Sequence, residues 1–120
     1  MTAALASNVV PITAEPTFDD FWAAVPPEKR IDKPLCRAKF AAITSKAGLT
    51  TKNLDKDSGE YVEIHLQASA ADILKGWVNY CREHATAETR WNPPSKMKLK
   101  EGGRFVRRPA TFLNRGGWDE

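Results

Sequence analysis

Cysteine is scarce in this sequence of 120 residues, and glycine and proline occur about as often as in an ordinary globular protein. The two cysteines, Cys36 and Cys81, lie far apart and cannot supply the framework of bridges that holds small secreted domains together. We therefore expect a reducing compartment and a fold that needs no disulfide. Seven glycines and eight prolines are too few for a low-complexity chain, so the composition predicts one small domain with a globular core.

The sequence also lacks a long apolar run. No stretch approaches the roughly 18 apolar residues needed to cross a membrane, and the mean hydropathy is −0.48. Residues 1–11 carry small apolar side chains without a basic region, so they do not match an export signal. We expect a cytoplasmic protein with no membrane partner. Two prolines and almost no charge in residues 1–16 predict a flexible leader, followed by a single small domain over residues 17–120.

Sequence motifs for catalysis are absent as well. The chain has no G-x-S-x-G elbow, no P-loop and no H-E-x-x-H helix, so we expect a protein that is not an enzyme. Cys81 and His84 have the spacing of a metal-ligand pair, but Cys36 and His65 do not form the second close pair that zinc sites normally have. We therefore expect no metal ion and no cofactor. A small magnesium nuclease is the weakest of three functional alternatives, and its candidate ligands are Asp55, Asp57, Glu60 and Glu63.

Charge is distributed unevenly along the chain. The total is +3, but residues 1–33 carry −2, whereas residues 90–117 carry +7, with eight basic residues against Glu101. A basic segment of this density is typical of a protein with an anionic partner, either nucleic acid or an acidic protein surface. A solvated basic face without a partner is the simplest alternative.

Local patterns predict two helices in the first half of the chain. Thr17 and Asp20 form a capping-box pattern, and the aromatic residues that follow lie on one face of a short helix that Pro26 must end. A second helix is expected over residues 34–47, because a proline suits the first turn and Gly48 suits the left-handed position after the end.

A strand and a third helix are expected in the middle of the chain. Residues 61–67 alternate between apolar and polar, which predicts a strand, and residues 49–54 are the candidate for a hairpin partner. Ser69 and Asp72 form a second capping pattern, ahead of the clearest amphipathic helix in the sequence. Its apolar face consists of Ile73, Leu74, Trp77, Val78 and Cys81. We expect that face to pack against Phe21, Trp22 and Phe40.

The predicted fold is therefore mainly α, with about three helices, a possible hairpin and an irregular basic C-terminal segment. In that segment, residues 96–100 alternate between basic and apolar, residues 102 and 103 form a turn, and residues 109–114 are expected to form one helical turn. Whether the segment over residues 90–120 docks on the helices is left open by the sequence.

Aromatic residues interleave with the basic ones in this segment. Basic side chains hold phosphates and aromatic rings stack on bases when a protein binds single-stranded nucleic acid. The candidate residues for binding nucleic acid or a protein partner are Trp91, Lys96, Lys98, Lys100, Arg104, Arg107, Arg108, Phe112, Arg115 and Trp118. The alternative is that Phe112, Leu113 and Trp118 are an anchor that docks the segment on the helices.

Both ends of the expected domain carry recognisable motifs. Residues 107–120 read RRPATFLNRGGWDE, and residues 18–26 read FDDFWAAVP. The first resembles the closing signature of phage and prophage replication proteins, among them replisome organisers and helicase-loader-like proteins, in which Pro-Ala-Thr-Trp-Leu-Asn and a spacer precede a tryptophan and acids. The second is similar to the F-x-x-F-W-x-x-Y-P opening of the same C-terminal module. Val25, Phe112 and Gly117 stand where that module has tyrosine, tryptophan and, commonly, arginine.

The resemblance covers residues 18–47 and 104–120 and implies a replication accessory protein in the cytoplasm of a bacterial host. It implies contact with single-stranded DNA or with a replisome protein such as the replicative helicase. Larger members of the family carry an additional N-terminal DNA-binding domain, which does not fit in this chain, so origin recognition is not implied. The competing hypothesis is a phage-encoded interaction module that inhibits or adapts a host enzyme and does not bind nucleic acid.

Overall fold

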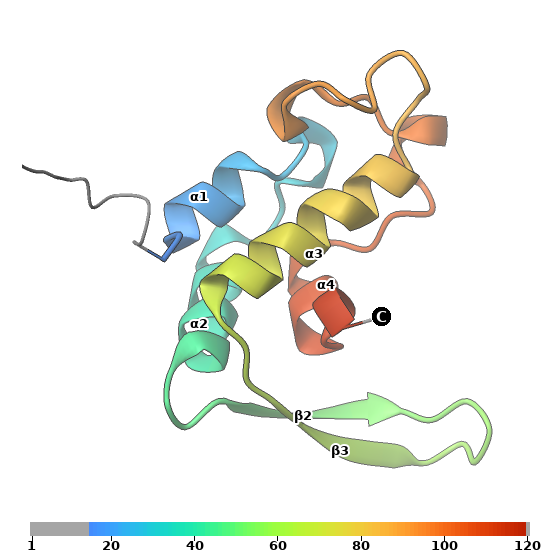
Figure 1. Ribbon diagram of the computed structural model, residues 1–120. Coiled ribbons are helices and arrows are strands. Elements are labelled where there is room, and N and C mark those ends of the chain that lie inside the picture. Colours follow the sequence, from blue (N-terminus) through green and yellow to red (C-terminus); the bar gives the residue numbers. More distant parts are fainter. Residues whose placement is uncertain (1–14, 120) are drawn as a thin grey trace, which may run out of the picture.

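The computed structural model describes residues 15–119, so most of the expected leader lies outside the described residues. Helices form about 49% of this part of the chain, and the expectation of a mainly α domain therefore holds only in part. The helices are α1 (Phe18–Ala23), α2 (Lys33–Thr44), α3 (Ala70–Glu83) and α4 (Pro109–Asn114), with short 3₁₀ helices η2 (Pro27–Lys29), η3 (Pro94–Lys96), η4 (Lys100–Gly103) and η5 (Gly117–Asp119). The strands are β2 (Leu49–Leu54) and β3 (Tyr61–Leu66), as Figure 1 shows.

The predicted start of α1 is confirmed, and its end comes slightly earlier than Pro26. The side chain of Thr17 accepts a hydrogen bond from the N–H of Asp20, whose carboxylate accepts one from the N–H of Thr17 at 2.8 Å. This reciprocal cap satisfies two of the N–H groups that the first turn of a helix leaves without partners. The last residue of α1 is Ala23.

Helix α2 ends at Thr44, three residues before the predicted end. The hydroxyl of Thr44 donates to the carbonyl of Phe40 at 2.8 Å, and that of Ser45 donates to the carbonyl of Ala42 at 2.6 Å. The carbonyl of Ala42, which the N–H of residue 46 would use in a longer helix, is thus occupied by the side chain of Ser45. The chain then reaches Gly48, which has the expected left-handed conformation, with φ +73°.

The expected hairpin is confirmed, with β2 antiparallel to β3 and Leu49 opposite Leu66. The predicted apolar face of β3 is only partly buried, because Leu66 lies in the core whereas Val62 is 48% exposed. Figure 1 shows the reason, since the hairpin extends beyond the helices toward its tip. The tip therefore has no neighbouring element to cover it.

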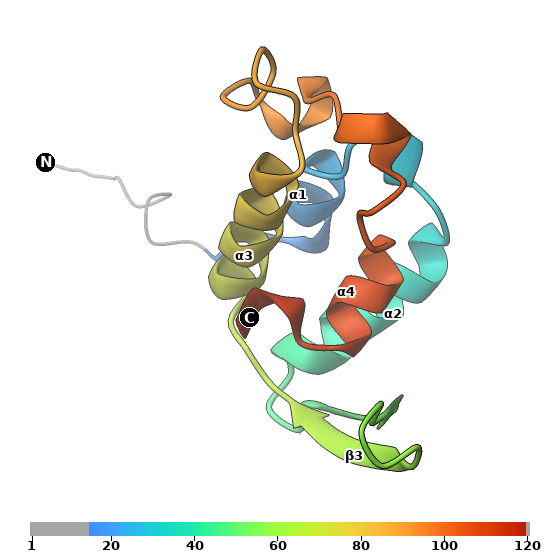
Figure 2. The same cartoon turned by 90° about the vertical axis from the view of Figure 1, so that its right-hand side faces the viewer.

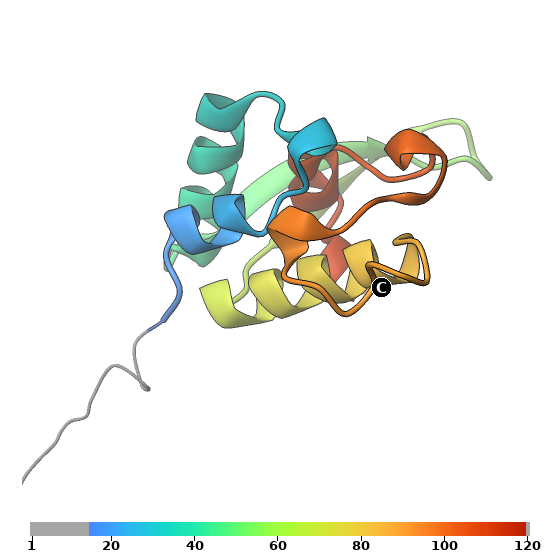
Figure 3. The same cartoon turned by 90° about the horizontal axis from the view of Figure 1, so that it is seen from above.

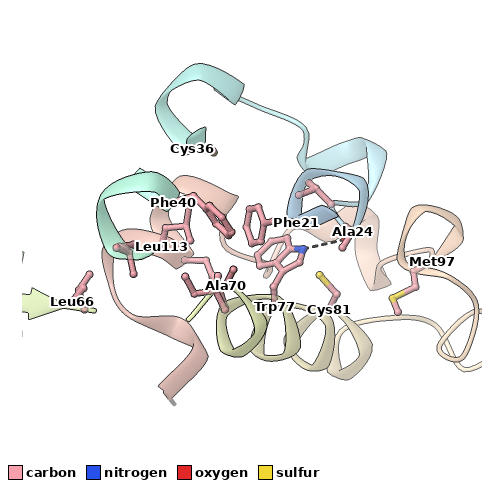
Figure 4. Close-up of a cluster of buried hydrophobic side chains, with 14 of the residues drawn as sticks. Phe21, Ala24, Cys36, Phe40, Leu66, Ala70, Trp77, Cys81, Met97 and Leu113 are labelled. Carbon is pink, nitrogen blue, oxygen red and sulfur yellow. Dashed lines mark hydrogen bonds between the residues drawn. The ribbon is translucent and has the colours of Figure 1, made fainter. Parts of the chain in front are cut away.

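Helix α3 is the centre of the core, as its amphipathic pattern predicts. Ser69 caps it by accepting from the N–H of Asp72 at 3.1 Å. The side chain of Trp77 is fully buried, and its ring centroid lies 5.8 Å from that of Phe21. The expected packing of α3 against α1 is confirmed, and Phe40 of α2 belongs to the same buried cluster (Figure 4), but Leu74 and Val78 are only partly buried.

The hairpin and residues 86–106 lie at opposite ends of the group of helices (Figure 1). Helices α2 and α4 lie side by side (Figure 2), and α3 crosses over both α1 and the C-terminal turn η5. The hairpin lies at one end of this helical body, and residues 86–106 cover the opposite end (Figures 1 and 3). The basic segment therefore begins at the end of α3 that is distant from the hairpin.

Candidate nucleic-acid interface

The segment after α3 presents lysines to the solvent because its apolar residues point inward. The N–H of Thr86 donates to the carbonyl of Lys98 at 2.8 Å, which fastens the returning chain next to the end of α3. Met97 and Leu99 are buried beneath this segment. Since the residues alternate, the exposed positions are Lys96, Lys98 and Lys100.

Trp91 is the most exposed of the large apolar side chains in the described part of the chain, with 79% of its surface exposed. The loop after α3 turns back so that the guanidinium carbon of Arg82 lies 5.3 Å from the centroid of the Trp91 ring. A cation at this distance is attracted by the negative face of the indole, and the contact positions the ring without burying it. The loop therefore holds an aromatic surface in the solvent.

An open pocket of about 530 Å³ adjoins this ring. We call it the Trp91 pocket, and it is lined by Asn79, Arg82, Glu83, Arg90 and Trp91. The Nε atoms of Arg82 and Arg90 are buried and have no hydrogen-bond partner. A buried donor without a partner costs on the order of 1–3 kcal/mol. Because these two Nε atoms have almost no accessible surface, a ligand in the pocket could reach only the other nitrogens of each guanidinium.

The 3₁₀ helix η4 extends the basic surface. The guanidinium carbon of Arg104 lies 5.3 Å from the centroid of the Phe105 ring, which is 61% exposed. The predicted turn at Gly102 and Gly103 is confirmed, because both residues have positive φ. A Cβ on Gly103 would lie 3.1 Å from Cε of Lys29, so η2 contributes a further lysine next to this turn.

Phe112 and Trp118, two of the ten predicted binding residues, pack in or against the hydrophobic core. Phe112 is fully buried, with its ring centroid 4.9 Å from that of Trp77, and Trp118 packs against Phe112 with centroids 6.2 Å apart. The prediction that Phe112 stacks on a base is therefore wrong, because no ligand can reach this ring. Trp118 is half-buried and lies against α3. The docking alternative accounts for both, because large apolar rings are most stable when buried.

The predicted arginines of the C-terminal part lie apart from the lysines. The backbone N–H of Arg107 donates to the hydroxyl of Tyr80 at 2.8 Å, which ties the segment to α3. Arg108 is the residue before α4, and Arg115 lines a pocket next to His65 of the hairpin. The predicted set is thus divided, since Lys96, Lys98 and Lys100 lie on the segment that follows Trp91, whereas Arg107, Arg108 and Arg115 lie next to α4.

The predicted binding set includes only Trp91 of the five residues that line the Trp91 pocket, and it lacks Arg90 of the basic segment as well as Asn79, Arg82 and Glu83 of α3. The three residues of α3 lie on its polar face at positions i, i+3 and i+4, which are neighbours on a helix surface. A polar helix face is ordinarily solvated, so this spacing alone gave no reason to select them. Their relation to Trp91 depends on the path of the loop between residues 84 and 91.

The buried thiols do not form a chemical site. Burial, together with the charge of Asp32, raises the pKa of the Cys36 thiol to about 11, and burial, together with Glu28, raises the pKa of Cys81 to about 12. Both thiols are therefore protonated at neutral pH and are poor nucleophiles. Within residues 15–119, no three side chains of His, Cys, Asp or Glu gather as metal ligands would.

A second surface feature is an apolar groove of about 580 Å³ between α1, α3 and η3. Its walls include Ala23, Leu74, Val78 and Pro94, and the acidic residues Glu15 and Asp20 lie at its edge. Because it is apolar with acidic edges, this groove has no features that favour a phosphate chain. It is better suited to a protein segment.

Comparison of the chain with protein-family models, with curated proteins and with solved structures gives no match. None of the helices in the described part of the chain is both long and apolar enough to span a membrane.

Proposed function

We propose that this chain is a phage-type DNA-replication accessory protein that binds single-stranded nucleic acid and does not act as a catalyst. The observation that carries the binding proposal is the exposed Trp91 ring, held by Arg82 and adjoining a pocket with a second cation, Arg90. The replication role depends on the resemblance of residues 18–47 and 104–120 to the module of phage replication proteins.

The chemistry of this surface favours single strands over duplexes. An unpaired base has an open face that stacks on an aromatic ring, typically for about 1–3 kcal/mol, whereas the bases of a duplex are already stacked on one another. In this proposal Lys98 and Lys100, which are exposed on the segment that follows Trp91, hold the phosphates of a strand whose base lies on that ring. The hairpin is a poor alternative, because its tip over residues 55–60 carries three acidic residues and one lysine.

A salt titration with single-stranded DNA tests this proposal. Each phosphate contact releases counterions, so log affinity is expected to fall with log salt by about 0.7 per contact. Replacing Lys98 and Lys100 by glutamine is expected to flatten the slope by roughly one to two such contacts. Trp91→Ala is expected to weaken binding at every salt concentration, with a loss of about 5-fold to 100-fold.

Matched controls come from the hairpin, which lies at the other end of the molecule. Tyr61→Ala removes a ring that is 71% exposed, and Lys52→Gln with Lys56→Gln removes two exposed charges. These variants are expected to bind like the wild type, apart from a small uniform effect of total charge. Absence of binding to any strand at low salt would contradict the proposal.

The second candidate function is a protein-interaction module, and the apolar groove with its acidic edges favours it. Its partner would be a replisome protein such as the replicative helicase, or a host enzyme that the chain inhibits or adapts. Ser95 is exposed at the edge of the groove, so Ser95→Trp is expected to fill the groove without disturbing the core. The interaction module is favoured if the wild type binds such a protein but not DNA, and if Ser95→Trp no longer binds that protein.

A further inference from the structure

The Trp91 pocket contains a feature that phosphate binding does not explain. Its two arginines suit an anion, yet Glu83 lies in the same pocket and would repel one. The carboxylate does not neutralise the arginines through Nε either, because the Nε atoms of Arg82 and Arg90 have no hydrogen-bond partner. A carboxylate in the same pocket as two arginines suits a ligand that carries hydrogen-bond donors as well as a phosphate.

The face of α3 sets the order of these groups. Asn79 and Glu83 are one helical turn apart, and Arg82 lies beside Glu83, with its guanidinium against the Trp91 ring. Because these three side chains line the same pocket as Trp91, a base stacked on this ring lies in a pocket that also contains a cation, an amide and a carboxylate. A nucleotide matches these groups, because it has a phosphate for the cation, a flat base for the ring and a polar base edge for the amide and the carboxylate.

The carboxylate limits which base fits. An ionised glutamate only accepts hydrogen bonds, and its two oxygens accept two adjacent donors at once. Guanine has two adjacent donors on its Watson–Crick edge, N1–H and the 2-amino group. Cytosine and adenine offer an amino group next to an acceptor nitrogen, and thymine and uracil offer one N–H between two carbonyls, whose oxygens the carboxylate repels.

We propose that the Trp91 pocket binds one guanine of single-stranded nucleic acid, with the base stacked on Trp91 and its Watson–Crick edge on Glu83. This inference rests on the proposed binding function and adds a base preference to it. Arg82 and Arg90 hold the adjoining phosphate, and the amide of Asn79 supplies a donor for the guanine O6. Discrimination by one bidentate contact of this kind is on the order of 5-fold to 100-fold.

Fluorescence anisotropy with thymine strands of about ten nucleotides tests the inference, because each strand can carry a single different base at its centre. The strand with guanine is expected to bind about tenfold tighter than the all-thymine strand. Hypoxanthine in place of guanine lacks the 2-amino group and is expected to lose most of that advantage. Glu83→Gln is expected to reduce the guanine preference to less than about threefold.

Glu88→Gln is the matched control, since Glu88 is an exposed acid outside the pocket and the substitution changes the net charge equally. It is expected to keep the guanine preference. Equal affinity for all strands, or a preference that survives Glu83→Gln, would overturn the guanine assignment and leave single-strand binding in place. Absence of binding to every strand at low salt would overturn both proposals, and the two failures are thus distinguishable.

Discussion

At the scale of single residues, the four tryptophans show how differently one residue type is used in this molecule. Trp77 is fully buried, and its indole N–H donates to the carbonyl of Ala24 at 3.1 Å. Trp22 and Trp118 are half-buried and pack at the edge of the core, whereas Trp91 is almost entirely exposed. Trp91 is the most exposed of the four rings, whereas Trp22 and Trp118 are partly occupied by contacts within the domain, although Trp118 also lines surface pockets.

Replacement of the central ring is expected to remove much of the domain's stability. Trp77→Ala deletes contacts with Phe21 and Phe112 and leaves the carbonyl of Ala24 without its donor. The expected loss is about 3–5 kcal/mol, out of a total that is typically about 5–15 kcal/mol for a small domain. Urea unfolding followed by circular dichroism measures it.

Trp91→Ala is the control for that experiment, and it is expected to change the free energy of unfolding by less than about 0.5 kcal/mol because the ring is exposed. A Trp77→Ala protein as stable as the wild type would contradict the placement of this ring in the core.

At the scale of elements, residues 109–119, which form α4 and η5, contact both the hairpin and α3. The carbonyl of Asn114 accepts hydrogen bonds from Thr51 at 3.0 Å and from Asn53 at 3.2 Å, and its side-chain oxygen accepts one from Lys39 at 2.8 Å. The turn η5 then lies on α3 next to Gly76. Residues 109–119 therefore have a structural role in this chain.

The contact between α3 and η5 predicts an unusual effect of alanine inside a helix. A Cβ at position 76 would lie 2.5 Å from both Cα and Cβ of Trp118. Alanine normally stabilises a helix by about 1 kcal/mol relative to glycine, but here it must displace η5. Gly76→Ala is therefore expected to lower stability by roughly 1–3 kcal/mol, measured by thermal unfolding.

Lys75→Ala provides the comparison for this variant, because Lys75 is the exposed neighbour in the same helix and its substitution is expected to leave stability nearly unchanged. A more stable Gly76→Ala protein would show that η5 does not lie against α3.

At the scale of the whole molecule, both ends of the described chain contribute to one core. The buried cluster contains Phe21 from α1, Trp77 from α3, and Phe112 and Leu113 from α4. The basic segment is therefore not a free tail, since it runs between the end of α3 and a helix that completes the core. Hydrogen bonds from Thr86 to the carbonyl of Lys98 and from Arg107 to Tyr80 fix its path on the domain.

A chain that ends at Arg108 is expected to lose cooperative unfolding altogether. This truncation removes three fully buried side chains, those of Pro109, Phe112 and Leu113. The loss of Phe112 and Leu113 alone costs on the order of 5–10 kcal/mol, which is comparable to the stability of the whole domain. Circular dichroism and the dispersion of amide signals in an NMR spectrum measure this loss. Removal of only Asp119 and Glu120 is the control, and this chain is expected to unfold in the same transition as the wild type. A cooperative unfolding transition in the chain that ends at Arg108 would contradict the single core.

The sequence by itself determined the elements whose signals are local. Thr17 and Ser69 start helices because a hydroxyl placed before the first turn satisfies the free N–H groups, and this chemistry needs no distant partner. The alternation over residues 61–67 predicted β3, and the amphipathic face of α3 predicted its burial. In each case the periodicity of the backbone sets which side chains share a face.

Only the tertiary structure decided which of the aromatic and basic residues face the solvent. Phe112 and Trp91 lie in similar basic surroundings in the sequence, yet one is buried and the other exposed, because α4 packs on α2 and the loop at Trp91 does not reach the core. Val62 is exposed despite its inward position, since the hairpin is longer than the surface that covers it. The pairing of Arg82 with Trp91 likewise depends on the path of a loop, which is set by contacts between distant segments rather than by local propensity.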